Sequence, residues 1–152
     1  MRICAGASAG GHMNQLLRLL DCSSSWPQQP DFYITTLQTV AKKLEKRGPV
    51  FVIGEANRQH PLKALLVLSR SMRIAIRERP DIVITTGSMP LAFFCFISKI
   101  LGASIVWIDS VANMERLSWS GQFATRFADL VLTQWPNLAT RDGRVQYAGE
   151  IL

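Results

Sequence analysis

Short apolar runs alternate with helix-like segments from one end of the chain to the other. Strands are predicted at the amino terminus and over 31–36, 50–54, 81–86, 103–108, 128–133 and 145–148. Helices are predicted after the first strand and over 38–47, 62–79, 91–101 and 118–127. Such alternation favours right-handed βαβ crossovers, which build a parallel sheet covered by helices on both faces. The 152 residues suffice for one such α/β domain, spanning 1–152, with a buried core.

The first strand leads into a turn of small residues, Ser8 to Gly11, and then into a leucine-rich helix. Gly10 and Gly11 permit positive φ and let a ligand approach the backbone with no Cβ in the way. The free N–H groups of the first helical turn and the helix dipole then favour an anion such as phosphate. Gly87 and Ser88 follow the fourth strand in the same way. Both turns are therefore predicted at one ligand-binding rim of a Rossmann-like sandwich.

His12 stands at the edge of the first glycine turn and is the candidate general base. Its neutral imidazole could take a proton from an acceptor hydroxyl, although a lone histidine more often caps a turn. Asp109 ends the fifth strand, could face the same crevice, and could be the partner of His12. Ser8 and Ser88 could bind phosphate, although capping is the commoner role of such residues. The set of residues predicted to bind substrate is completed by Asn14, Ser110 and Asn113.

The glycine pattern disfavours two familiar nucleotide sites. Its spacing is not that of the dinucleotide motif G-x-G-x-x-G, and no acidic residue closes the second strand to hold a ribose. It also lacks the Gly-Lys-Ser/Thr ending of a Walker A loop. No metal is expected, because Cys4, Cys22 and Cys95 have no metal-like spacing. Cys4 and Cys95 are predicted to be buried inert thiols, which indicates a reduced, cytosolic protein.

The chain is basic, with seventeen Lys and Arg against eleven Asp and Glu and a formal net charge of +6. This balance favours a nucleic acid, a phosphorylated substrate or an anionic lipid surface as partner, and a basic domain with no polyanionic partner remains an alternative. The helix predicted over 62–79 combines a basic stripe with apolar residues at helical spacing, which are Leu62, Leu65, Leu66, Met72 and Ile76. Such a helix could lie on a membrane, but a core-facing helix with a solvated cationic back is favoured.

The apolar run from Leu91 to Ile108 is nearly long enough to span a bilayer. Lys99 and Gly102 interrupt it, so we interpret it as a core helix followed by a strand. No signal peptide is expected, because Arg2 is followed at once by strand-like sequence.

Four segments carry a resemblance to a known family. The chain resembles the small half-glycosyltransferases, which comprise PssD-type bacterial proteins of exopolysaccharide assembly and the membrane-anchoring subunit of a two-piece eukaryotic enzyme. That enzyme adds the second N-acetylglucosamine in dolichol-linked oligosaccharide synthesis. The glycine loop is also distantly similar to that of MurG, a peptidoglycan glycosyltransferase. The matching segments cover nearly the whole chain and are SAGGHMNQLLRLL (8–20), ITTGSMPLAFFCFISKILG (84–102), IVWIDSVANMERLSWSGQ (105–122) and ADLVLTQWPNL (128–138).

The resemblance implies the N-terminal half of a GT-B fold, in which this half supplies the acceptor side and the membrane attachment. A second half-chain would bind most of the UDP-sugar, which is a donor substrate, so no cofactor is expected. By position, Gly10, Gly11 and His12 match the family's loop near the acceptor and its diphosphate, and Gly87 and Ser88 match its second glycine turn. The chain departs from the family's pattern in lacking an N-terminal membrane helix and in carrying Asp109 and Asn113 where Glu and Arg are usual.

The leading hypothesis is a subunit of a two-chain, metal-independent glycosyltransferase that is inactive without its partner. It would transfer a sugar, N-acetylglucosamine by resemblance, from a UDP-sugar to a polyprenyl-diphosphate-linked saccharide in polysaccharide or glycolipid synthesis. It would sit peripherally on the anionic cytoplasmic face of the cell membrane, with no nucleic-acid partner. The alternatives are a non-catalytic scaffold that recruits a catalytic partner to the membrane, and a free-standing nucleotide-binding domain.

Overall fold

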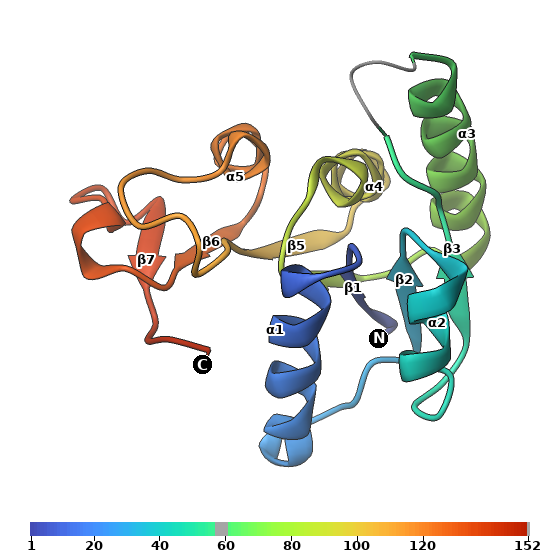
Figure 1. Cartoon of the computed structure of the whole chain (residues 1–152), viewed down its shortest axis with the longest axis horizontal. Helices are drawn as coiled ribbons and strands as arrows, with labels where there is room; N and C mark the ends of the chain where they lie inside the picture. The colour runs from blue at the N-terminus through green and yellow to red at the C-terminus, as the bar shows by residue number, and fades with distance from the viewer. Residues whose placement is uncertain (57–60, 152) are drawn as a thin grey trace.

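The computed structural model describes residues 1–56 and 61–151 and shows one parallel sheet between two layers of helices (Figure 1). The order across the sheet is β3-β2-β1-β4-β5-β6-β7, and every neighbouring pair is parallel. The expected Rossmann-like domain with seven strands is therefore confirmed. The strands are β1 (Ile3–Ala7), β2 (Phe32–Thr35), β3 (Val50–Val52), β4 (Ile82–Thr85), β5 (Ser104–Ile108), β6 (Leu130–Thr133) and β7 (Val145–Tyr147).

The helices divide between the two faces of the sheet (Figure 1). On one face lie α1 (Gly11–Asp21) and α2 (Gln38–Leu44), and on the other lie α3 (Pro61–Glu78), α4 (Met89–Ile100) and α5 (Trp119–Ala124). Two short 3₁₀ helices, η1 (Ser23–Ser25) and η2 (Pro136–Leu138), lie in connections. Because strand side chains alternate between faces, Cys4 joins the core under α3 and α4 while Ala5 joins the core under α1 and α2.

The central strand β1 and helix α4 are in close contact. A Cβ added to Gly6 would lie 2.9 Å from Cδ1 of Leu91, so the missing side chain lets α4 pack against the sheet. Cys4 and Cys95 are fully buried and unpaired, and burial raises the pKa of both thiols. The prediction that these two cysteines are buried is confirmed, and the raised pKa disfavours their reactive thiolate form, whereas Cys22 is exposed.

The apolar run from Leu91 divides as expected into a helix, α4, and a strand, β5. Within 1–56 and 61–151, no helix combines the length and apolar character needed to cross a bilayer.

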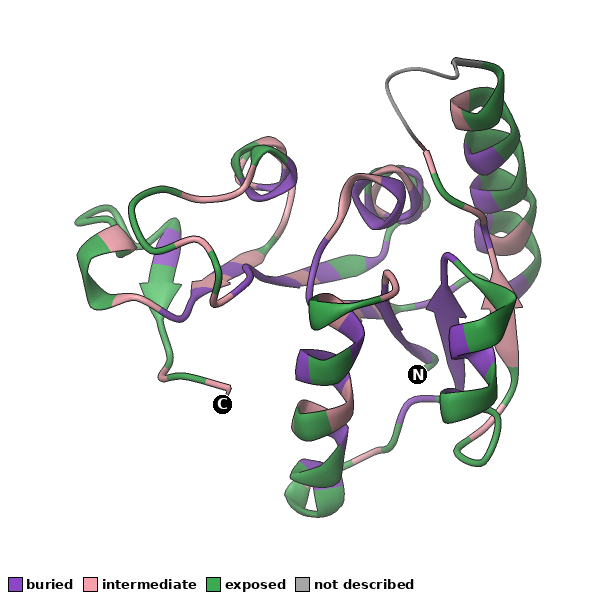
Figure 2. Cartoon of the chain, in the orientation of Figure 1, coloured by how far each residue is buried: buried purple, intermediate pink, exposed green. Residues whose placement is uncertain are grey.

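The favoured interpretation of α3 was right in one respect, because the helix packs on the core through Val67 and Ala75, but wrong about which side chains form its buried face. Its large apolar side chains point outward, with exposed fractions from 36% for Leu68 to 76% for Leu62. The side chains that α3 buries are smaller or polar, namely Val67, Ser71, Ala75 and Glu78 (Figure 2). Small side chains on the inner face let α3 lie close to the sheet and α4, so the leucines were left on the outside. The helix thus carries an exposed apolar stripe beside its basic residues.

Candidate functional site

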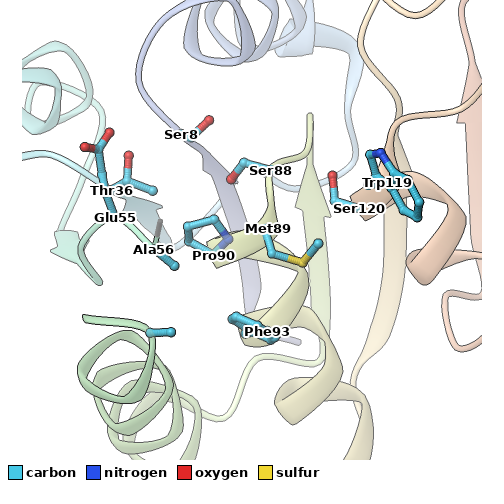
Figure 3. Close-up of a pocket in the computed structure, with 11 residues that line it drawn as sticks. Ser8, Thr36, Glu55, Ala56, Ser88, Met89, Pro90, Phe93, Trp119 and Ser120 are labelled. Atoms are coloured by element: carbon cyan, nitrogen blue, oxygen red, sulfur yellow. The ribbon is translucent and has the colours of Figure 1, made fainter. Parts of the chain in front are cut away.

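The turns that follow β1, β2, β3 and β4 surround one cavity at the carboxyl rim of the sheet, together with α3, α4 and the start of α5. Its volume is about 640 Å³, within the range of small-molecule sites. Figure 3 shows side chains from the turns after the strands and from α4 and α5 around it. The lining residues are Ser8, Thr36, Glu55, Ala56, Ala64, Ser88, Met89, Pro90, Phe93, Trp119 and Ser120.

His12 bridges the two glycine turns. Its Nδ1 lies 2.6 Å from the carbonyl oxygen of Thr86, and Oγ1 of Thr86 donates to the carbonyl oxygen of His12 at 2.7 Å. Because a carbonyl oxygen only accepts, Nδ1 must carry a proton, and the neutral ring then has its lone pair on Nε2. The ring is half-buried, and a backbone contact rather than a carboxylate fixes its tautomer.

Gly87 packs against the same imidazole. It has φ of +105°, and an added Cβ would lie 3.3 Å from Cε1 of His12 and 3.2 Å from Cζ2 of Trp107. A side chain here would be strained by conformation and would also press on both rings. The predicted meeting of His12 with the second glycine turn is therefore confirmed.

The expected pairing of His12 with Asp109 was wrong. Asp109 is only 2% exposed, and its carboxylate accepts from the backbone N–H of Ser118 at 2.9 Å and from Oγ of Ser118 at 2.6 Å. The indole N–H of Trp107 lies 3.4 Å from the same carboxylate. Asp109 therefore turns toward its own following loop, and its geometry fits a structural carboxylate rather than a catalytic one.

This buried carboxylate organises the start of α5. Oγ of Ser118 accepts from the backbone N–H of Gly121 at 2.8 Å and so caps the helix while donating to Asp109. An added Cβ on Gly121 would lie 2.6 Å from Oδ1 of Asp109, so only glycine fits. The arrangement presents Trp119 and Ser120 to the cavity.

The first glycine turn is open to solvent. Gly10 has φ of +87° and needs glycine for its conformation. A Cβ on Gly11 would meet no atom within 4 Å, so the fold itself does not require glycine there. The open space leaves room for a ligand to approach the backbone, as predicted. Ser8 lines the cavity, and Asn14 is exposed on the first turn of α1.

Ser88 does not cap α4, contrary to the commoner expectation. It adopts φ of +110°, unusual for a residue with a side chain, and makes no side-chain capping bond. Its Oγ is buried in the cavity wall without a hydrogen-bond partner in the described structure. A buried, unpaired hydroxyl is costly, and a ligand acceptor atom would satisfy it.

Ser110 and Asn113 support the rim from outside the cavity. Oγ of Ser110 accepts from Nε2 of Gln15 at 3.2 Å and from the N–H of Ala112 at 3.3 Å. Nδ2 of Asn113 lies 3.5 Å from Asp109, a weak contact. Neither residue lines the cavity, and the same holds for His12 and the glycines of both turns. The hydrogen bonds of Ser110 to Gln15 and Ala112 nevertheless favour a structural role for it over the predicted substrate binding.

Gln134 organises the rim, although the sequence alone did not point to it. Its Nε2 donates to Oε1 of Gln15 at 2.8 Å and to the carbonyl oxygen of Asp109 at 2.9 Å, while its Oε1 accepts from the N–H of Ile151 at 2.7 Å. Four segments are joined by this one buried amide. Its position directly after a predicted strand was the available signal in the sequence, but partners so distant along the chain cannot be read from spacing.

The cavity residues Phe93 and Trp119 were also missed as site residues, because apolar residues on helices are more often core. Among the described residues, no group of three or more His, Cys, Asp or Glu side chains could hold a metal ion.

Comparisons with known proteins agree with this architecture. A family model described as "Oligosaccharide biosynthesis protein Alg14 like" matches residues 51–151. The UDP-N-acetylglucosamine transferase subunit alg14 of Schizosaccharomyces pombe is 37% identical over 165 residues, which cover 93% of this chain and 79% of that protein. The corresponding ALG14 subunit of Homo sapiens is 25% identical over 181 residues, covering 100% and 83%.

Two solved structures share the fold. MurG of Acinetobacter baumannii superposes with a TM-score of 0.76 at 16% identity, and the UDP-GlcNAc 2-epimerase of Methanocaldococcus jannaschii with 0.72 at 11%. Each match covers 99% of this chain but 46% of the other, so the chain spans less than half the length of either protein.

We predict that Gly121→Ala lowers the free energy of unfolding by about 1–3 kcal/mol, because the new methyl group must displace the Asp109 carboxylate. Gly11→Ala is the matched control and should change it by less than about 0.5 kcal/mol, since its Cβ meets nothing. Urea denaturation followed by circular dichroism measures both. Equal stability of the two variants would show that the Asp109 contact is not tight.

Proposed function

Because the chain belongs to the Alg14 family of oligosaccharide biosynthesis proteins, we propose that it is a subunit of a two-chain glycosyltransferase. The complex transfers N-acetylglucosamine from UDP-N-acetylglucosamine to a saccharide carried on a polyprenyl diphosphate. The names of its relatives support the sugar donor, and the fold shared with MurG supports a glycosyltransferase architecture. This chain supplies the acceptor side of the cleft, and its partner binds the donor.

The observation that carries the proposed role is the position of His12 between the two glycine turns, bonded to Thr86 and packed on Gly87, which precedes the cavity residue Ser88. Nε2 accepts the proton of the acceptor hydroxyl, whose oxygen forms the bond to the anomeric carbon of the sugar while the bond to UDP breaks. The contact between Nδ1 and Thr86 keeps Nε2 as the basic atom throughout. The N–H groups beside Gly10 and Gly11 stabilise diphosphate charge near the reaction. The UDP-sugar is a substrate, and no further cofactor is proposed.

The face of α3, α4 and α5 is the proposed membrane-binding surface. Fourteen large hydrophobic side chains are exposed in the described part of the chain, and ten lie on these three helices and the C-cap of α4. On α3 the apolar stripe runs beside Lys63, Arg70 and Arg73, all exposed. Arg77 is already paired with Glu78 at 2.7 Å. Apolar area next to cations that make no ion pair within residues 1–56 and 61–151 fits a peripheral position on an anionic bilayer, which we assign to the cytoplasmic face of the cell membrane.

The same surface also favours the second candidate function, a scaffold that only brings a catalytic partner to the membrane. The two candidates differ in what His12 does. A scaffold needs its surfaces but no base at the rim.

We therefore predict that His12→Ala, assayed in the complex with the partner subunit, lowers kcat by about 10²–10⁴-fold, as expected for loss of a general base. Arg18→Ala, exposed on the same helix, is the control and should keep full activity. Co-purification shows whether the partner is still bound. Full activity of the His12 variant with the partner bound would establish the scaffold role instead.

For the membrane surface, we predict that the double variant Arg70→Glu/Arg73→Glu loses binding to phosphatidylglycerol vesicles in co-sedimentation. Each cation near an anionic surface contributes about 1 kcal/mol, so the affinity should fall by roughly tenfold or more. Lys42→Glu/Lys43→Glu makes the same charge change on α2, on the other face, and should bind nearly as well as the parent. Equal losses for both pairs would mean that net charge alone governs binding.

A further inference from the structure

We propose that the rim cavity holds the lipid end of the acceptor, with the first isoprenoid units of the polyprenyl chain between α3 and α4 and the diphosphate at the glycine turns. This inference rests on the proposed function, since it takes the acceptor class from there. The proposal gives the polyprenyl chain of the acceptor a binding site of its own, in addition to any site for the phosphates or the sugar.

The cavity has two chemically distinct ends (Figure 3). Ser8, Ser88 and Ser120 line the end beside the glycine turns and the start of α5. Ala64 and Phe93, from α3 and α4, line the other end. Pro90 and Met89 lie between the two ends, so the polar groups give way to an apolar wall along the cavity. A ligand with a charged head and a hydrocarbon tail matches this division.

The polar end is prepared for an anion. The hydroxyl of Ser88 is buried and makes no hydrogen bond to a described residue, and Ser88 has φ of +110° directly before α4. The helix dipole of α4, which spans twelve residues, favours negative charge at the same place. The carboxylate of Glu55 also lines the cavity, beside Thr36, and repels an anion there. The head group is therefore placed on the side of Ser88 and Ser120, away from Glu55.

The apolar end is lined by α3 and α4, two of the helices that carry the proposed membrane-binding surface. Ala64 belongs to α3, and its neighbour Leu65 is exposed on that surface. The small side chains of Ala56 and Ala64 leave the space that the polyprenyl chain would occupy. The side chains of Ala64, Pro90 and Phe93 carry no hydrogen-bonding group, so a sugar or a nucleobase would be left unpaired against them. A prenyl chain that leaves the bilayer beside α3 meets no such penalty.

The test is isothermal titration of the isolated full chain with four soluble ligands: inorganic pyrophosphate, and isopentenyl, geranyl and farnesyl diphosphate. We expect the affinity to rise with chain length, by at least tenfold from pyrophosphate to farnesyl diphosphate. Ala64→Trp should fill the apolar end and remove this gain while leaving pyrophosphate binding unchanged. Ser69→Trp, exposed on the same helix, is the control and should keep the gain.

Ala64→Asp is the second variant, in case the tryptophan disturbs folding, and circular dichroism melting confirms that each variant is folded. Equal affinity for all four ligands, or farnesyl binding that neither Ala64 variant weakens, would overturn the assignment even if the reconstituted complex transfers sugar. An affinity that rises with prenyl chain length and depends on Ala64 supports the cavity assignment, whether or not the reconstituted complex transfers sugar. Failure of that complex to transfer sugar would count against the proposed function alone.

Discussion

The contact between Nδ1 of His12 and the carbonyl oxygen of Thr86 is the interaction on which the rim depends. It joins the turn after β1 to the turn after β4, two strands that are neighbours at the centre of the sheet. The return bond from Thr86 to the backbone of His12 closes this link, and Gly87 makes room for the imidazole against Trp107. Because the link is to backbone, it fixes both the position and the tautomer of the ring without placing a second charge beside it.

A second rigid unit surrounds the buried carboxylate of Asp109. Ser118 satisfies that carboxylate and caps α5 with the same hydroxyl, and Gly121 allows the close approach. On the other side, Gln134 binds the carbonyl oxygen of Asp109 and ties it to α1. One unit thus orients the candidate base and the other sets the cavity wall at Trp119 and Ser120. A site assembled in advance loses little energy to reorganisation when ligands bind.

Much of this fold was predictable, because strand and helix periodicities are local and strand exits of a parallel sheet share one rim. This reasoning correctly predicted that His12 and Gly87, which follow different strands, lie close together. It failed for Asp109, since spacing cannot show that a carboxylate turns back to its own loop to meet Ser118. It failed for α3 because the inner face uses small residues such as Ala75, which leaves leucines such as Leu65 outside. The cavity joins residues from distant segments, so no local pattern revealed it.

The central claim is that the fold presents Nε2 of His12 as the basic atom at the rim. Nitrogen-15 NMR of the histidine side chains, at a pH where the rings are neutral, tests this most directly. The chain has two histidines, so a His60→Gln variant assigns the signals. The account predicts that the His12 ring is protonated at Nδ1, with Nε2 showing the shift of an unprotonated nitrogen. A ring protonated at Nε2, or one that exchanges freely between both tautomers, would contradict it.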